Sequence, residues 1–322
     1  MGAPPDEFRL IADLFAPLAA GFPGALGLAD DAALLPCPPD ADCVATVDAI
    51  VAGIHFLPDA PPEEIARRLV RVNVSDLAAK GARPVAALLT AAFPKGIDDD
   101  WLRRFAAALG EDLRLFGMAL AGGDTVATPG PLTLSLTAFG QVARGRMLLR
   151  SGASAGDDVW VSGTIGDAAL GLLVATGALP ADRHLEDRYR MPRPRAELGP
   201  HLVGVASAAM DVSDGLVQDL GHLCRASGLG AAIGADAVPL SDAAAAVVAA
   251  DHSHLATVLT GGDDYELLFT APPDRRAGVA ETAAGIGVAV TRIGAMTAGE
   301  GVTVADADGH PLVLAHGGWR HF

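Results

Sequence analysis

The chain has 322 residues, of which 51% are hydrophobic, and its formal net charge at pH 7 is −16. This length predicts about two globular domains with enough apolar surface for real cores. The negative charge excludes sequence-independent binding to nucleic acid, because such binding depends on a basic surface. An acidic chain can still bind phosphates through a divalent metal ion.

No N-terminal stretch combines the basic head, apolar middle and small-residue cleavage site of a signal peptide. No apolar run approaches the roughly 20 residues that a membrane span requires. We therefore expect a cytoplasmic protein without a membrane partner. The three cysteines are an odd number and lack metal-ligand spacing, which favours reduced thiols over a disulfide framework or a zinc site.

The first half of the chain alternates helix-like and strand-like patterns. Apolar spacing predicts helices near 7–20, 63–80 and 99–116, the last one capped by Asp98. Strands are expected at 43–51, 84–93 and 131–142. This pattern indicates a mixed α/β domain over 1–145, which ends in a Gly-rich passage near 143–156.

A second mixed α/β domain is expected over 146–322. It opens with the strand DVWVSG and ends in a hairpin around the turn DADGHP. Further strands are expected near 265–270 and 287–294. The predicted helices lie near 166–176, 215–227 and 273–284.

Six acidic clusters end or interrupt apolar runs, which is unusual because a buried charge without a partner is costly. They contain Asp30 with Asp31, Asp48, Asp76, Asp124, Asp211 with Asp214, and Asp263 with Asp264. Each has a local explanation: Asp214 could cap a helix, Asp76 could cap or bridge within its helix, and Asp124 could shape a turn. If the clusters converge, however, their charges repel, and a hard cation with oxygen ligands, best Mg²⁺, is the natural remedy.

Magnesium in such a site usually implies phosphate chemistry, because it shares its remaining positions with substrate phosphates. The chain has only two lysines, and neither stands in a G-x-x-x-x-G-K-[ST] frame, which excludes a Walker-type nucleotide site. Phosphates would instead be held by metal ions, by the backbone amides of AGGD and SGTIGD, and by an arginine such as Arg150.

The motifs occur in an order found in one known family. They are DDAALL, TVDAIVAGIHF, NVSDLAAKGARP, AGGDT, LLRSGASAGDDVWVSGTIGDAALGL, MDVSDGLVQDLGHL, GGDDYELLFT and the terminal GGWRHF. From about residue 7 to its end, the chain resembles the thiamine-monophosphate kinase family of the aminoimidazole ribonucleotide synthetase superfamily. The resemblance implies an α/β (mixed α+β) fold of two domains, with ATP in a cleft between the domains. It also implies N-terminal sheets that pair across a homodimer, and apolar strands with open edges favour the same assembly.

The resemblance further implies the reaction, in which ATP and thiamine monophosphate give thiamine diphosphate and ADP. The implied Mg²⁺ ligands are Asp30, Thr46, Asp48, Asp76, Asp124, Asp211 and Asp214. The implied ATP contacts are Gly123, Asp124, Arg150 and Ser213. The implied contacts to thiamine monophosphate are His55, Asp263 and Trp319. No general base is expected, because a phosphate with a second pKa of about 6 is already largely anionic near neutral pH.

Four positions depart from the family pattern, namely Ala29, Val47, Asp263 and Trp319. They replace a glycine, a hydroxyl residue, a glutamate and a frequent tyrosine, respectively. Two alternatives stay open: another ATP-using member of the superfamily, or a catalytically silent nucleotide-binding assembly module. Single residues also have structural explanations: His55 as a core histidine, Trp319 as a seal over an apolar edge, and Arg150 as a salt-bridge partner at a domain junction.

Overall fold

The computed structural model describes residues 7–30 and 32–319, and the chain divides into two compact units. The first unit comprises Met1–Leu77 with Ala82–Gly145, and the second comprises Ala78–Gly81 with Arg146–Phe322. Within the described ranges, no helix has the length and apolar character needed to cross a membrane. The functional roles expected of the two domains stay predictions.

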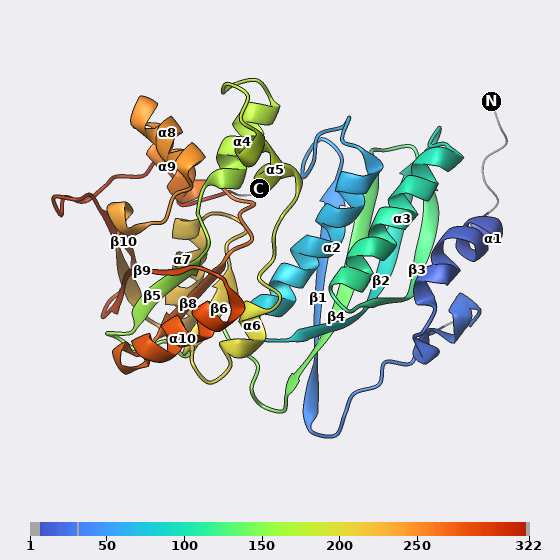
Figure 1. Cartoon of the computed structure of the whole chain (residues 1–322), viewed down its shortest axis with the longest axis horizontal. Helices are drawn as coiled ribbons and strands as arrows, with labels where there is room; N and C mark the ends of the chain where they lie inside the picture. Colours follow the sequence, from blue (N-terminus) through green and yellow to red (C-terminus); the bar gives the residue numbers. More distant parts are fainter. Residues whose placement is uncertain (1–6, 31, 320–322) are drawn as a thin grey trace. The chain divides into compact units, whose positions relative to one another are not determined.

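The first unit is built on a four-stranded sheet with the strand order β1-β4-β2-β3 (Figure 1). The strands are β1 (Ala41–Val51), β2 (Arg83–Pro94), β3 (Ala119–Thr128) and β4 (Thr133–Ala143). β4 runs antiparallel to both of its neighbours, whereas β2 and β3 are parallel. The helices α2 (Pro62–Ala79) and α3 (Asp99–Leu115) lie side by side over one face of this sheet.

Strand β1 separates an inner face from an outer face by simple alternation. Val44 and Ile50 are buried on the inner face, and the partly buried Thr46 and Asp48 lie between them on the same face. The intervening residues on the outer face are exposed, including Val47. The inner face therefore combines a packed core with a short polar strip.

Several expected elements of the first unit are confirmed, one expectation was wrong, and one strand had not been predicted. Asp98 caps α3, because its carboxylate accepts a 2.8 Å hydrogen bond from the amide of Trp101. The helix expected over 7–20 is instead α1 (Glu7–Leu10), a π-helical turn and a 3₁₀ turn, since Pro17 lacks the amide that an α-helix needs there. Strand β3 was not expected, because its two glycines weaken the strand pattern.

The second unit contains a six-stranded sheet with the order β10-β7-β9-β5-β8-β6. The strands are β5 (Asp158–Ser162), β6 (Ala208–Asp211), β7 (Gly230–Gly234), β8 (Leu267–Ala271), β9 (Val290–Thr297) and β10 (Gly301–Ala305). Only the pair β10–β7 is parallel. The expected strands correspond to β5, β8 and β9, displaced by at most a few residues.

Seven α-helices accompany this sheet in the described part of the second unit. They are α4 (Asp167–Ala175), α5 (Arg183–Arg190), α6 (Leu198–His201), α7 (Leu216–Ser227), α8 (Asp242–Ala250), α9 (His254–Thr260) and α10 (Arg276–Ile286). The expected helices correspond to α4, α7 and α10. Of the other four, α5, α6 and α9 are short, and α8 consists almost entirely of Ala and Val, so none gives a clear periodic pattern. Three leucines of α7, Leu216, Leu220 and Leu223, are fully buried in the core of this unit and hold the helix against it.

The expected terminal hairpin is reduced to a turn. Ala305 and Pro311 form a single antiparallel bridge, and the amide of Leu312 donates a 2.8 Å hydrogen bond to the carbonyl of Val304. β10 pairs instead with β7, and the chain continues without further strands to Trp319.

Candidate active site

Three predicted metal ligands of the first unit lie together where β1 faces α2. The hydroxyl of Thr46 donates a short hydrogen bond to the carboxylate of Asp76. The amide of Asp48 donates a 3.0 Å bond to the side-chain oxygen of Asn73, one turn earlier on α2. The Asn73 amide is in turn anchored on the carbonyl of Leu69 at 2.9 Å. Asp76 of α2 thus bonds to strand β1 instead of bridging within its own helix.

His55 follows β1 and folds back onto it. Its Nδ1 accepts a 3.1 Å hydrogen bond from the amide of Val51. A ring nitrogen that accepts from an amide carries no proton, so the neutral ring has its proton on Nε2. The imidazole therefore presents an N–H donor, which suits contact with a phosphate oxygen better than the role of a general base.

Gly123 and Asp124 lie on β3, at the opposite edge of the sheet from β1. Three strand spacings, about 14 Å, separate the two edges. The ladder aligns Asp124 with Ala49 through one residue each on β2 and β4, and aligned residues share a face. Asp124 therefore lies on the outer face, whereas Thr46 and Asp48 lie on the inner face. Within one chain, the sheet separates Asp124 from the group around Thr46.

Asp30 is exposed in a bend after the 3₁₀ segment Pro23–Leu28. The second aspartate of this pair, Asp31, lies outside the described residues.

In the second unit, two motifs far apart in sequence lie against each other. The amide of Asp263 donates a 2.9 Å hydrogen bond to the carbonyl of Ser213, and the amide of Tyr265 donates a 2.8 Å bond to Val212. Gly215 has a φ of +121°, and a side chain there would meet the carbonyl oxygen of Thr260 at 2.6 Å. This close approach brings a predicted ATP contact next to a predicted substrate contact.

The loop around Asp263 has an unusual backbone. Asp263 has a φ of +73° and Tyr265 a φ of +52°, values that side-chain-bearing residues rarely adopt. The hydroxyl of Tyr265 donates a 3.2 Å hydrogen bond to the carboxylate of Asp263. Residues held in such conformations concentrate at functional sites, so the backbone supports the selection of Asp263 as a site residue.

The C-terminal segment reaches the same loop. The amide of Trp319 donates a 2.9 Å bond to the carbonyl of Asp214, and the Gln218 side chain donates a 2.6 Å bond to the carbonyl of Trp319. The Trp319 residue is 56% exposed. A tryptophan that seals an apolar edge would be largely buried, so this explanation loses support and a ligand contact gains it.

The loop between Asp211, which ends β6, and α7 is held by hydrogen bonds to a buried residue that was not singled out from the sequence. One carboxylate oxygen of Asp219 accepts hydrogen bonds from the amides of Ser213, Asp214 and Gly215, at 3.0, 3.0 and 3.1 Å. The N-cap of α7 is Gly215 and no side chain caps the helix there, so the interpretation of Asp214 as a cap was wrong. Burial, and then the neighbouring charge of Asp211, raise the pKa of Asp219 to about 8.

A second buried aspartate acts on the SGTIGD turn in the same way. Asp264 is fully buried and accepts hydrogen bonds from the amides of Gly166 at 2.7 Å and Ala168 at 3.3 Å. The amide of Ile165 donates to the carbonyl of Pro239. The expectation that these amides hold phosphates was thus wrong, because groups of the protein already accept them. Burial raises the pKa of Asp264 to about 8.

Arg150 is exposed, and its carbonyl accepts a 3.3 Å hydrogen bond from the hydroxyl of Ser227, the last residue of α7. Burial, Arg225 and Arg150 lower the pKa of His222 on α7, while Asp214 acts in the opposite direction. Arg150 and Asp214 therefore lie within electrostatic range of the same imidazole. This neighbourhood is consistent with an arginine that meets a phosphate close to Asp214.

The chemistry of these side chains fits Mg²⁺. The grouped donors of the first unit are the oxygens of Thr46, Asp48 and Asp76, and hard cations prefer such ligands. In the second unit, Asp211 is buried, and its charge and that of Asp214 both raise the pKa of Asp219. Carboxylates that are gathered in this way repel one another until a cation joins them.

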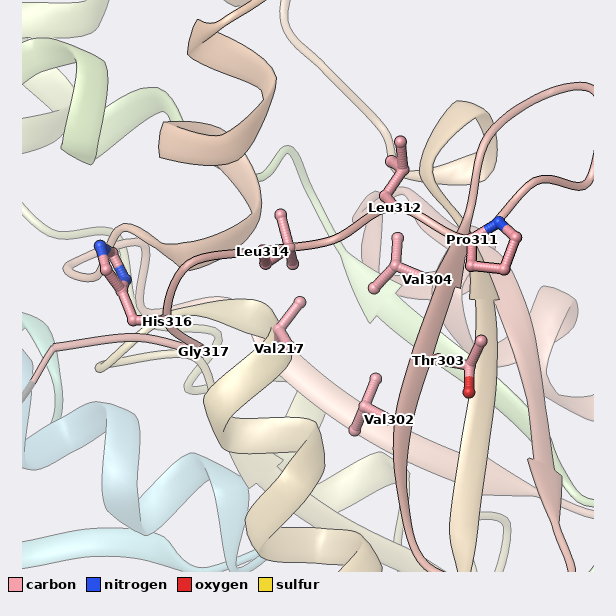
Figure 2. A pocket seen from close by; sticks show the side chains of 9 residues that line it. All are labelled: Val217, Val302, Thr303, Val304, Pro311, Leu312, Leu314, His316 and Gly317. Atoms are coloured by element: carbon pink, nitrogen blue, oxygen red, sulfur yellow. The ribbon is translucent and has the colours of Figure 1, made fainter.

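An apolar hollow adjoins this region but contains none of the predicted site residues (Figure 2). Its walls come from the first turn of α7, from β10 and from the segment that leads to Trp319. The lining side chains include Val217, Val302, Val304, Leu312, Leu314 and His316. The hollow therefore belongs to the packing of the C-terminal segment and is separate from the acidic loops.

Comparisons with known proteins place the chain in a family. Residues 29–142 match the N-terminal domain of AIR synthase related protein, and residues 154–307 match its C-terminal domain. A thiamine-monophosphate kinase of Caulobacter vibrioides is 43% identical over 99% of this chain and 92% of its own length.

Two solved structures extend the comparison. The crystal structure of thiamine-monophosphate kinase from Stenotrophomonas maltophilia K279a is 39% identical, with a TM-score of 0.85 over 94% of this chain and 97% of that chain. The structure of AaThiL complexed with AMPPCP and TMP is 30% identical, with a TM-score of 0.79 over 98% and 97% of the two chains.

The chain is thus an AIR synthase related protein, and within that group it belongs to the thiamine-monophosphate kinase family. This membership confirms the expected family, the two-domain α/β (mixed α+β) fold and the expected enzyme class, a phosphotransferase.

Proposed function

We propose that this protein transfers the γ-phosphoryl group of ATP to thiamine monophosphate, forming thiamine diphosphate and ADP. The observation that carries the proposal is the hydrogen bond from the amide of Asp263 to the carbonyl of Ser213, in a chain of this family. It brings a candidate nucleotide contact beside a candidate substrate contact. The related AaThiL structure contains AMPPCP, an ATP analogue, together with TMP.

Mg²⁺, when bound, neutralises phosphate charge and aligns the two reacting phosphates. Thr46, Asp48 and Asp76 would hold it in the first unit, and Asp211 and Asp214 would do so in the second. Asp30 and Asp124 complete the proposed ligand set.

The remaining residues bind and orient. The Nε2–H of His55 donates to a phosphate oxygen of the substrate, and the hydroxyl of Ser213 and the guanidinium of Arg150 donate to the nucleotide phosphates. Gly123 lets the backbone come close to the nucleotide. Asp263 and the Trp319 ring contact the thiamine moiety. No residue has to remove a proton, because the attacking phosphate oxygen is already anionic near neutral pH.

We also propose a cytoplasmic homodimer. Two amides of the edge strand β1, those of Asp48 and Val51, donate to side chains of the same chain, so the edge strand gives little reason to expect a second copy. The outer face of the sheet is a better argument. Val47 is 59% exposed and Val126 is 48% exposed on that face, which favours its burial against a second copy. Asp124 lies on the same face.

The proposal is tested by incubating the purified protein with ATP and Mg²⁺, with and without thiamine monophosphate. We expect ADP release that depends on thiamine monophosphate, with equal amounts of thiamine diphosphate. Unphosphorylated thiamine is the control acceptor and should yield nothing. Equal ADP release without any acceptor, or the absence of thiamine diphosphate, would argue for a different reaction.

A further inference from the structure

We propose that Asp219 is a positioning residue that fixes the loop after Asp211, the last residue of β6, and with it the direction in which Asp214 meets a metal ion. The inference deepens the proposed function and rests on it, because the metal role of these two aspartates is part of that proposal. Asp219 itself is not proposed as a ligand. It acts through the backbone of the loop, which it holds from inside the second unit.

Three backbone amides of the loop donate hydrogen bonds to a single oxygen atom. The Oδ2 atom of Asp219 accepts from three consecutive amides, those of Ser213, Asp214 and Gly215, all within 3.1 Å. Each hydrogen bond sets the direction of one planar peptide group. Three consecutive fixed planes determine where the side chains of Ser213 and Asp214 leave the backbone. The direction of these two side chains therefore depends on a single carboxylate.

This arrangement also decides how the loop can bind phosphate. Consecutive amides that point into one concavity form an anion site in many proteins. In this chain the concavity is filled by the carboxylate of Asp219, which is only 1% exposed. A nucleotide phosphate therefore has no access to these three amides. The loop must act through its side chains, which makes their direction critical.

Asp219 is also not a simple cap of α7. The N-cap position is Gly215, which has no side chain, whereas Asp219 lies in the first turn of the helix and reaches back to the loop. A cap of α7 alone would be served by a serine or asparagine at the N-cap position. The carboxyl group of Asp219 instead organises three amides of the loop that carries Ser213 and Asp214.

The test compares Asp219→Ala and Asp219→Asn with a matched control, Asp158→Asn. Asp158 is an equally buried aspartate of the same unit, and it is bound to Arg276 at 2.6 Å and to Arg292 at 3.2 Å. It belongs to β5 and has no bond to the acidic loop. All three variants should lower the melting temperature, because each replaces a buried carboxyl group that accepts several hydrogen bonds.

The discriminating measurement is Mn²⁺ binding in the presence of AMPPCP, followed by electron paramagnetic resonance. Outer partners of metal ligands typically change metal affinity roughly ten- to a hundredfold, so Asp219→Ala should raise the Mn²⁺ dissociation constant by about that factor. Asp219→Asn keeps one acceptor oxygen without its charge and should give a smaller, several-fold increase. Asp158→Asn should stay within about twofold of the wild type.

If Asp219→Ala does not fold, Asp219→Asn decides. An unchanged Mn²⁺ constant in a folded Asp219 variant would overturn the proposal, and so would an equal loss of affinity in Asp158→Asn. Wild-type protein that binds Mn²⁺ with AMPPCP but makes no thiamine diphosphate would refute the proposed reaction alone. The role of Asp219 would still be tested by the binding data.

Discussion

The amide of Trp319 donates a 2.9 Å hydrogen bond to the carbonyl oxygen of Asp214. Through this bond, a residue proposed to contact thiamine monophosphate is attached to the loop proposed to hold metal. Gln218 of α7 holds the same residue through its carbonyl, because the Gln218 side-chain amide donates a 2.6 Å hydrogen bond to the carbonyl of Trp319. The backbone at Trp319 is thus fixed, while the residue as a whole is 56% exposed.

Replacing Trp319 by alanine should weaken the binding of thiamine monophosphate and leave ATP binding nearly unchanged. The thiazolium ring is positively charged, so an aromatic face offers a cation–π interaction of about 0.5 to 2 kcal/mol in addition to burial. At about 1.4 kcal/mol per factor of ten, the apparent constant for thiamine monophosphate should rise several-fold to some tens-fold. Steady-state kinetics with each substrate measures both constants.

Trp319→Phe is the matched variant and should recover most of the loss. A tryptophan with only a structural role would give the opposite pattern, a lower melting temperature with both substrate constants unchanged.

Gly318→Ala should displace the C-terminal segment. A Cβ atom at Gly318 would lie 2.5 Å from the carbonyl oxygen of Asp214 and 2.5 Å from the Cβ of Gln218, closer than atoms tolerate. We expect the constant for thiamine monophosphate to rise roughly as much as in Trp319→Ala. The neighbouring Gly317→Ala is the control, because its Cβ would meet only Gln218 at an ordinary 3.8 Å. Equal kinetics of the two alanine variants would contradict this prediction.

Asp48→Asn and Asp124→Asn should each nearly abolish activity, because each is proposed to remove a metal ligand. The two residues lie on opposite faces of one sheet. If the outer faces pair in the dimer, Asp124 of each chain can serve the partner's site. A purified heterodimer of the two variants then has one site with both substitutions and one site with neither. It should show about half of the wild-type activity per dimer.

Co-expression of the two variants with different affinity tags yields this heterodimer. An inactive heterodimer would assign Asp48 and Asp124 to the same chain's site. Near-normal turnover in either folded single variant would remove that residue from the metal set.

The dimer itself is predicted to depend on the outer face of the first unit's sheet. Light scattering should give about twice the 32.6 kDa of one chain at micromolar concentration. Val47→Glu puts a charge on this face, where Val47 is 59% exposed in the single chain. The substitution should shift the protein to the monomer without unfolding it. A monomeric wild type would refute the homodimer.

The stability of the metal-free protein should fall with rising pH, in part because of Asp264. Its pKa is about 8 in the folded protein, through burial, against roughly 3.9 for a free aspartate. The folded state therefore binds the extra proton between these values. The stabilisation is complete below about pH 4 and is lost as the pH rises through about 8. Asp219 contributes in the same direction.

Melting temperatures between about pH 6 and pH 9 test this prediction, and Asp264→Asn should flatten their decline. Asp158→Asn is the control. Hydrogen bonding to Arg276 lowers the pKa of Asp158, so its stabilisation is present above its unfolded value and is lost only in acid. A slope that is identical in wild type and Asp264→Asn would show that Asp264 does not titrate in this range.

Local sequence patterns predicted the elements that local physics determines. The strand pattern of β1, the apolar spacing of α2 and the Asp98 cap of α3 were all recognisable, because each depends on residues close in the chain. The prediction of one N-terminal helix was wrong because of Pro17. Strand β3 was missed because it is an edge strand with two glycines.

In the candidate site, too, the sequence predicted some features and missed those that depend on distant parts of the chain. Motif order supplied the acidic residues and the family, but the contacts that organise them are long-range. The role of Asp264 depends on a turn almost 100 residues earlier in the chain, at Gly166. Asp219 had a local signal, an acid in the first turn after a glycine, but only the structure identifies the three amides that it accepts.

The central claim is that this chain phosphorylates thiamine monophosphate, and transfer of a label tests it most directly. ATP labelled with ³²P in its γ-phosphate is incubated with Mg²⁺, thiamine monophosphate and the protein, and the products are separated. We predict one labelled phosphate per thiamine diphosphate formed, and a product that disappears in Asp48→Asn. Label that accumulates only as inorganic phosphate, or that remains in ATP, would contradict the claim.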